Sequence, residues 1–190
     1  YYDSTSTDLR VATYWGGGGS GCTDSAWNGC GRIENSAGDV GNQSGLAFDA
    51  SGLAWVAYRD STNGTLKYAK KNWANNGNTC GTGVTDWDCS LVDNKFDVGR
   101  DPSIAFDANG SAYIASYDAT NSDLRVAIYV GSGGTNACGA GFTGQWSCST
   151  VDGSSNDVGH DARIVFDAAN QAWISEGDHS AANARLARYV

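Results

Sequence analysis

Short apolar runs separated by turn residues recur along the chain, and the clearest copy spans residues 97–130. In that copy an apolar run at 103–106 ends in Asp-Ala-Asn-Gly, and a second apolar run follows at 112–117. An Asn-Gly pair between two apolar runs is a strong signal for an antiparallel hairpin. The next run, 123–130, is rich in β-branched and aromatic residues, which is typical of a third strand.

This pattern recurs with a period of about 58 residues, in copies that begin at Val40, Val98 and Val158. The predicted third strands are 8–15, 65–72, 123–130 and 183–190. A Gly-rich segment then leads to predicted fourth strands at 27–33, 87–92 and 146–151. One repeat is therefore predicted to be a four-stranded antiparallel meander. The chain becomes a single repeat domain of about three blades, divided as 1–39 (partial), 40–97, 98–157 and 158–190 (partial).

The second strand of the repeat is predicted to be buried on both faces. Along 112–117 both alternating sets of side chains are apolar or small. Such a sheet needs a neighbour on each side, which is the situation of a blade in a propeller. The sequence thus predicts an all-β, propeller-type fold, with a β-sandwich or another β-repeat array as the alternative.

Composition supports this fold and excludes some partners. The chain has 26 Gly but one Pro, and 41% of its residues are hydrophobic, which favours short strands and tight turns. Its formal net charge is −9, and its 12 basic residues are scattered. Phosphate backbones and anionic lipids repel such a surface, and no apolar run is long enough to insert into a membrane.

The six cysteines fall into local pairs that bracket the Gly-rich segments: Cys22 with Cys30, Cys80 with Cys89, and Cys138 with Cys148. This repeated placement predicts three local disulfides. The alternative is zinc, but two thiolates without a nearby His are half a site. Disulfides imply an oxidising compartment, so we expect a secreted or cell-surface protein. Because the sequence starts at Tyr1 without a signal peptide, we also expect a processed or partial chain.

Residues 102–118 resemble the NHL-type repeat of β-propellers, in which a strand, an Asp-x-x-Gly turn and an apolar second strand ending in Asp recur. The resemblance covers the first three strands of each copy, and the disulfide-closed segment and longer period depart from it. It implies a propeller fold and a tendency toward binding or scaffolding. The Ser-x-Asp-x-Gly-x-x-x-Trp box of sialidase-type propellers is absent, which argues against an inherited glycosidase activity.

Two loops of each blade are expected on one face: the turn between the second and third strands, and the link to the next blade. This face collects charged and polar residues that differ between copies, as an asymmetric site requires, although surface variation gives the same pattern. No Ser or Cys nucleophile accompanies its two histidines, so no catalytic residue is assigned. The candidate ligand-binding residues there are Arg59, Arg100, His160 and His179.

On the opposite face, Trp27, Trp87 and Trp146 precede the second cysteine of each pair. Exposed Trp side chains in these positions would form a multivalent sugar-stacking surface. The alternative is that each Trp packs on its disulfide at the rim of a blade.

Acidic residues at the ends of the second strands are expected to stabilise the fold rather than to bind a ligand. Each is followed seven residues later by a base, which predicts an ion pair across the hairpin. The predicted pairs are Asp3–Arg10, Asp60–Lys67, Asp118–Arg125 and Asp178–Arg185. The other loop aspartates are expected to bond backbone N–H groups; calcium is possible there, but no dedicated metal site or other cofactor is predicted.

These features together predict a non-enzymatic extracellular scaffold or self-assembling protein, which completes its blades with other copies through terminal strand edges. A multivalent carbohydrate-binding module is the first alternative. A sialidase-like glycoside hydrolase is a more distant one, because the sequence offers no clear acid pair.

Overall fold

The computed structural model describes residues 1–14, 16–77, 79–134, 136–139 and 144–189. Within these ranges it contains fourteen strands and one short 3-10 turn: β1 (Tyr2–Asp3), β2 (Asp8–Tyr14), β3 (Trp27–Arg32), β4 (Val40–Phe48), β5 (Ala54–Asp60), β6 (Thr65–Lys71), β7 (Trp87–Asp93), β8 (Arg100–Phe106), β9 (Ala112–Asp118), β10 (Asp123–Tyr129), η1 (Asn136–Cys138), β11 (Trp146–Asp152), β12 (Val158–Phe166), β13 (Ala172–Asp178) and β14 (Asn183–Arg188). Among these residues no helix is long and apolar enough to cross a membrane. The predicted third-strand ends at Trp15 and Val190 lie outside the described residues.

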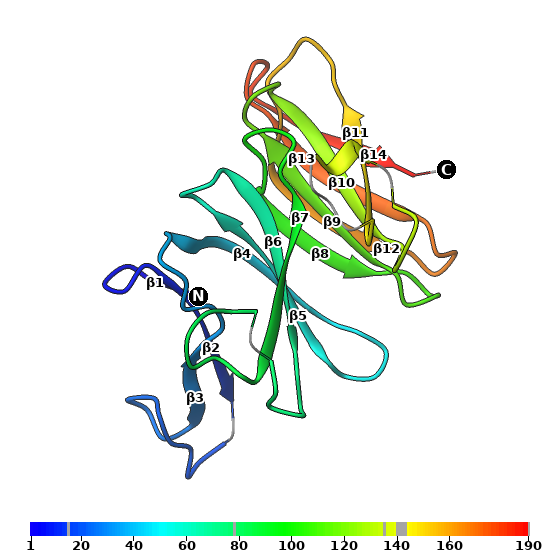
Figure 1. Ribbon diagram of the computed structural model, residues 1–190. Helices are drawn as coiled ribbons and strands as arrows, with labels where there is room; N and C mark the ends of the chain where they lie inside the picture. Colours follow the sequence, from blue (N-terminus) through cyan, green and yellow to red (C-terminus); the bar gives the residue numbers. More distant parts are fainter. Residues whose placement is uncertain (15, 78, 135, 140–143, 190) are drawn as a thin grey trace.

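The strands form four antiparallel sheets in which neighbours in space are also neighbours in the chain. We number these sheets in chain order: β1 to β3, β4 to β7, β8 to β11, and β12 to β14. They follow one another like the ribs of a fan, with β4 packed beside β8 and β8 beside β12 (Figure 1). This arrangement is propeller-type, and it confirms the predicted all-β fold class.

The first two strands of each complete repeat pair as the predicted antiparallel hairpin. In the third sheet Ile104 lies opposite Ile114, and Phe106 lies opposite Ala112. The Gly110 N–H closes the turn by donating to the carbonyl of Asp107 at 3.0 Å, with Gly110 at a φ of 84°. A positive φ is strained for most residues but not for glycine, which explains the turn sequence.

The hydrophobic core lies between the sheets. Trp146 of the third sheet is fully buried against Tyr68 of the second. Leu124 and Ile164 belong to a separate cluster between the third and fourth sheets. Each inner sheet is therefore covered on both faces, as the apolar character of both faces predicted.

A Val-Gly pair stands where each link ends and the first strand of the next sheet begins, and it packs tightly on the preceding sheet. Val98 is fully buried, and its N–H donates to the carbonyl of Gly64 at 3.0 Å. Gly99 has a φ of 84°, and a Cβ built there would lie 2.9 Å from Cα of Leu66. Gly41 and Gly159 lie equally close to the equivalent leucines. Only glycine combines this backbone conformation with this close approach.

The predicted ion pairs within the hairpins are confirmed for two copies: Asp3–Arg10, whose Oδ2 and Nε atoms are 2.7 Å apart, and Asp178–Arg185, at a longer distance. Three of the bases pair with an acid of the preceding sheet or of the link that follows that sheet: Lys67 with Glu34, Arg125 with Asp93, and Arg185 with Asp152. Arg185 also lies 3.7 Å from Asp178. The prediction was wrong for Asp60 and Asp118, because both carboxylates accept hydrogen bonds within their own turns.

Three disulfides join the predicted cysteines, and they confirm each local pairing. Cys22–Cys30, Cys80–Cys89 and Cys138–Cys148 have Cα–Cα distances of 5.1, 4.9 and 5.0 Å. Each ties a fourth strand to the segment that precedes it. Three disulfides indicate folding in an oxidising environment.

Candidate functional site

Three aspartates, which we name the link aspartates, precede the Val-Gly pairs: Asp39, Asp97 and Asp157. Each is bonded to the second hairpin of the sheet that follows. The N–H of Asp157 donates to Ser180 Oγ at 2.8 Å, and its carbonyl accepts from the N–H of His179 at 2.8 Å. Asp39 and Asp97 repeat both bonds. The backbone thus fixes each link carboxylate at a boundary between two sheets.

At the boundary of the second and third sheets, two arginines occupy the link carboxylate. Arg59 and Arg100 each donate to Asp97, at 2.6 and 2.8 Å. Arg59 is 7% exposed and also donates to the carbonyl of Val98. The structure therefore places both predicted arginines in an ion-pair network that joins neighbouring sheets.

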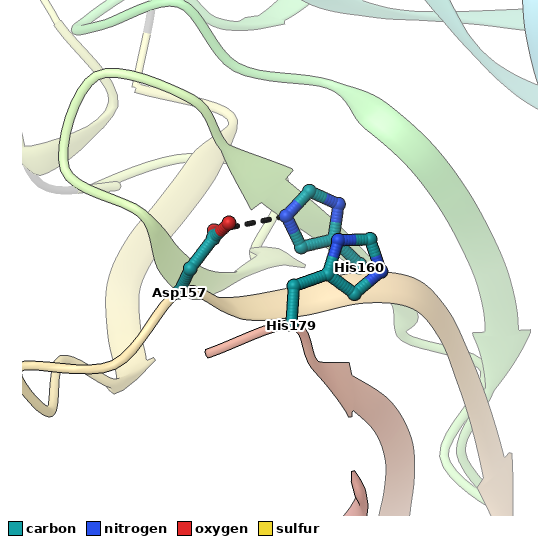
Figure 2. Close-up of side chains that lie close together, drawn as sticks. All are labelled: Asp157, His160 and His179. Carbon is teal, nitrogen blue, oxygen red and sulfur yellow. Dashed lines mark hydrogen bonds and ion pairs between the residues drawn. The ribbon is translucent and has the colours of Figure 1, made fainter. Parts of the chain in front are cut away.

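At the boundary of the third and fourth sheets, the link carboxylate meets both histidines of the chain. Tyr117 Oη donates to Asp157 Oδ1 at 2.8 Å. His160 Nε2 lies 2.9 Å from the same oxygen, and Figure 2 shows this contact with the His179 ring beside it. The His160 ring stacks on His179, with centroids 3.7 Å apart and planes 5° apart. It also lies 3.9 Å from the Tyr117 ring. We name Asp157, His160 and His179 the histidine cluster.

The histidine cluster contains the donor set of a metal site. One side-chain ligand atom from each member lies within 4.8 Å of the others. Partial burial raises the pKa of the Asp157 carboxyl, but hydrogen bonds from Tyr117 and His160 and the nearby imidazoles lower it by more. The net pKa lies below its usual range, so Asp157 carries a negative charge at neutral pH.

The sequence of the fourth sheet departs from the repeat where the histidines lie. Gly177 stands where the earlier copies have Tyr2, Arg59 and Tyr117, whose side chains reach a link aspartate. A Cβ at Gly177 would lie 3.5 Å from His160 Cβ and 3.6 Å from His179 Cδ2. The missing side chain therefore leaves room beside the two rings.

Two of the three tryptophans predicted to stack on sugars are buried. Trp87 and Trp146 are 2% and 0% exposed, because each packs against the preceding sheet. Rings this little exposed cannot stack on a sugar, so the sugar-stacking interpretation was wrong for both. Trp27 is 40% exposed and meets Tyr14 edge to face.

A cleft of about 500 Å³ opens between the first and second sheets. We name it the aromatic cleft, and its exposed aromatic side chains are Tyr14, Phe48 and Trp73. The equivalent place between the second and third sheets is filled by Tyr68 and Tyr129. Val11 and Lys71 occupy those repeat positions here. Smaller and polar side chains therefore keep this boundary open.

Polar groups converge on the same cleft. Lys71 Nζ lies 2.7 Å from Asp86 Oδ2, and it sits 5.2 Å above the rings of both Trp73 and Trp87. Sequence reasoning missed Trp73, although a signal was present. Trp73 is 71% exposed and stands where the other copies have Gly16 and Gly131.

Comparisons with known proteins find a likeness among solved structures. No protein-family model matches the chain, and no curated protein matches it. A solved structure similar to the chain is an exo-1,5-α-L-arabinanase from a bovine ruminal metagenomic library, with 10% identity and a TM-score of 0.48. The match covers 90% of this chain, which spans 59% of the length of that structure.

The match corrects one prediction made from the sequence. The matched structure is that of an enzyme, so the predicted absence of enzymatic activity is overturned and is not retained. At this identity and TM-score, the likeness assigns no substrate and no catalytic residue to the chain. The resemblance to NHL-type repeats stays a prediction.

Proposed function

We propose that the protein is a secreted, propeller-type protein that binds carbohydrate in the aromatic cleft. The observation that supports this most directly is the cleft itself, in which exposed aromatic rings lie beside paired charges. Ligand sites combine apolar walls with a few fixed polar groups. A sugar ring presents an apolar C–H face to an aromatic ring and hydroxyl groups to polar side chains, so it suits this lining.

Trp73 and Lys71 form the centre of the proposed site. The ammonium of Lys71 is held by Asp86 and lies over two indole rings, so its position is fixed by three contacts. Asn28 and Arg32 border the cleft on the side of the first sheet. A ring stacked on Trp73 would place its hydroxyl groups within reach of these donors and acceptors.

The test uses the full chain on a glycan array, followed by calorimetry with the retained glycans and with arabino-oligosaccharides. We expect Trp73→Ala to weaken binding about tenfold or more, as loss of an aromatic contact residue does at binding sites. The matched control is Tyr189→Ala, because Tyr189 is also exposed but lies beyond β14, away from the cleft.

Retention of no glycan, or equal binding by the wild type and Trp73→Ala, would overturn the proposal. A loss of binding that Tyr189→Ala reproduces would also count against the cleft. The assembly of copies through terminal strand edges stays a prediction, which sedimentation of the native chain tests.

A further inference from the structure

We infer that the histidine cluster binds one divalent transition-metal ion of the Zn²⁺ class, at the boundary of the third and fourth sheets. This goes beyond the proposed function and does not depend on it. The cluster lies where β12 begins and β13 ends, whereas the aromatic cleft lies where β4 and β6 end. The two sites therefore occupy opposite ends of the strands and different boundaries.

The residue types in the histidine cluster are those of a transition-metal site. The chain contains two His in 190 residues, and their rings are stacked on each other beside a carboxylate. Two imidazole nitrogens and one carboxylate oxygen suit Zn²⁺ and its neighbours in the first transition row, whereas Ca²⁺ takes oxygen ligands only. Three protein ligands would leave a fourth position open for water or another small ligand.

The distances between the ligand atoms of the histidine cluster also suit a bound zinc ion. Zinc at about 2.1 Å from each ligand atom holds those atoms roughly 3.4 Å apart. The ligand atoms here lie within 4.8 Å of one another, and His160 Nε2 is already 2.9 Å from Asp157 Oδ1. Ligand lone pairs lie in the ring plane, so the exposed His179 ring must turn out of its parallel stack to reach the ion. Gly177 leaves space for that rotation.

The surroundings orient the carboxylate as a metal ligand requires. Tyr117 Oη donates to Asp157, and the Ser180 hydroxyl fixes its backbone. Metal ligands are commonly held by such outer hydrogen bonds, whose loss costs 10- to 100-fold in affinity. Tyr117 is thus a positioning residue, and Tyr117→Phe is expected to weaken metal binding about tenfold.

The preceding boundary is a natural comparison within the same chain. There Asp97 is bonded by Arg59 and Arg100, and Ala119 stands where the fourth sheet has His179. Guanidinium groups are permanently charged and cannot ligate a cation. The repeat therefore shows which residues preserve the fold at a link aspartate without making a metal site.

The experiment titrates Zn²⁺ into the full chain and follows heat and the imidazole nitrogen resonances. We expect saturable uptake of one ion per chain, with shifts of both imidazoles. His179→Ala and His160→Arg copy the residues of the third sheet and should fold, and each is expected to weaken uptake at least tenfold. Asp39→Asn, at a link aspartate without histidines, is the matched control and should bind as the wild type does.

Two results would overturn the inference. One is a titration without saturable uptake or imidazole shifts. The other is unchanged affinity in both histidine variants, which would place the ion elsewhere. The imidazole shifts can be assigned to the cluster because the chain has no other histidines. Among the described residues there are also no free cysteines to compete for the ion.

Discussion

Glu176 in β13 is a buried carboxyl whose ionisation should destabilise the fold. It is 4% exposed, and neither oxygen has a hydrogen-bond partner of good geometry among the described residues. Burial and the nearby carboxylates of Asp152 and Asp178 raise its pKa by more than Arg185 and the N–H of Gly159 lower it, and the net pKa is about 7. The equivalent positions hold Tyr58 and Ser116, which carry no such charge at neutral pH.

The sign and size of the effect follow from this pKa. Since the folded pKa lies above the ordinary value of 4.5, the folded state keeps a proton that the unfolded state has released between pH 4.5 and 7. The free energy of unfolding therefore falls as pH rises through this window. A shift from 4.5 to about 7 corresponds to at most about 3 kcal/mol. Dielectric screening near the protein surface reduces the expected value below this limit, to about 2 kcal/mol.

Glu176→Gln removes the charge and keeps the shape. We expect the variant to gain about 2 kcal/mol over the wild type at pH 8 and to match it near pH 4.5. Urea unfolding at a series of pH values measures the difference, and ionisations common to both proteins, including those of the histidines, cancel. If the two proteins show the same pH dependence, the carboxyl ionises normally in the folded state and the reasoning fails.

Two further predictions concern stability. Trp146→Ala should lower the free energy of unfolding by about 3 to 5 kcal/mol, because it empties the centre of the core between the second and third sheets; a loss below 1 kcal/mol in urea unfolding would contradict that packing. Gly99→Ala should cost about 1 to 3 kcal/mol through its positive φ and the contact with Leu66. A thermal unfolding midpoint unchanged by this substitution would contradict the tight link.

The strands and hairpins could be predicted because they depend on local pattern. Alternation, the Asn-Gly turn and the repeat together fixed the pairing of β8 with β9. The disulfides could be predicted equally well, since each closes a short loop at the same place in the repeat.

Contacts between sheets were harder to predict, because side-chain direction decides them. A constant spacing of Asp and base favoured pairs within a hairpin, but Arg125 turns toward the preceding sheet and meets Asp93. Likewise, Trp87 and Trp146 could be placed beside their cysteines, while their burial depends on the neighbouring sheet. The positions of Trp87 and Trp146 in the repeat do not indicate that the neighbouring sheet buries them.

The histidine cluster was predictable in part. Loop order placed His160 and His179 on one face, but their stacking depends on the irregular register between Val158 and His160 and on Gly177. The aromatic cleft was not predicted, because the residues common to all copies do not indicate it. Trp73 departs from the repeat, and such departures mark both candidate sites.

The Val-Gly pairs give all three junctions between sheets the same structure. Gly41, Gly99 and Gly159 each lie against a leucine of the preceding sheet. At each junction the link aspartate forms the same backbone hydrogen bond with the second hairpin of the sheet that follows. Gene duplication could therefore lengthen or shorten the array without inventing a new connector. Each new copy would then be free to diverge at its loops, as the fourth sheet has done with its two imidazoles.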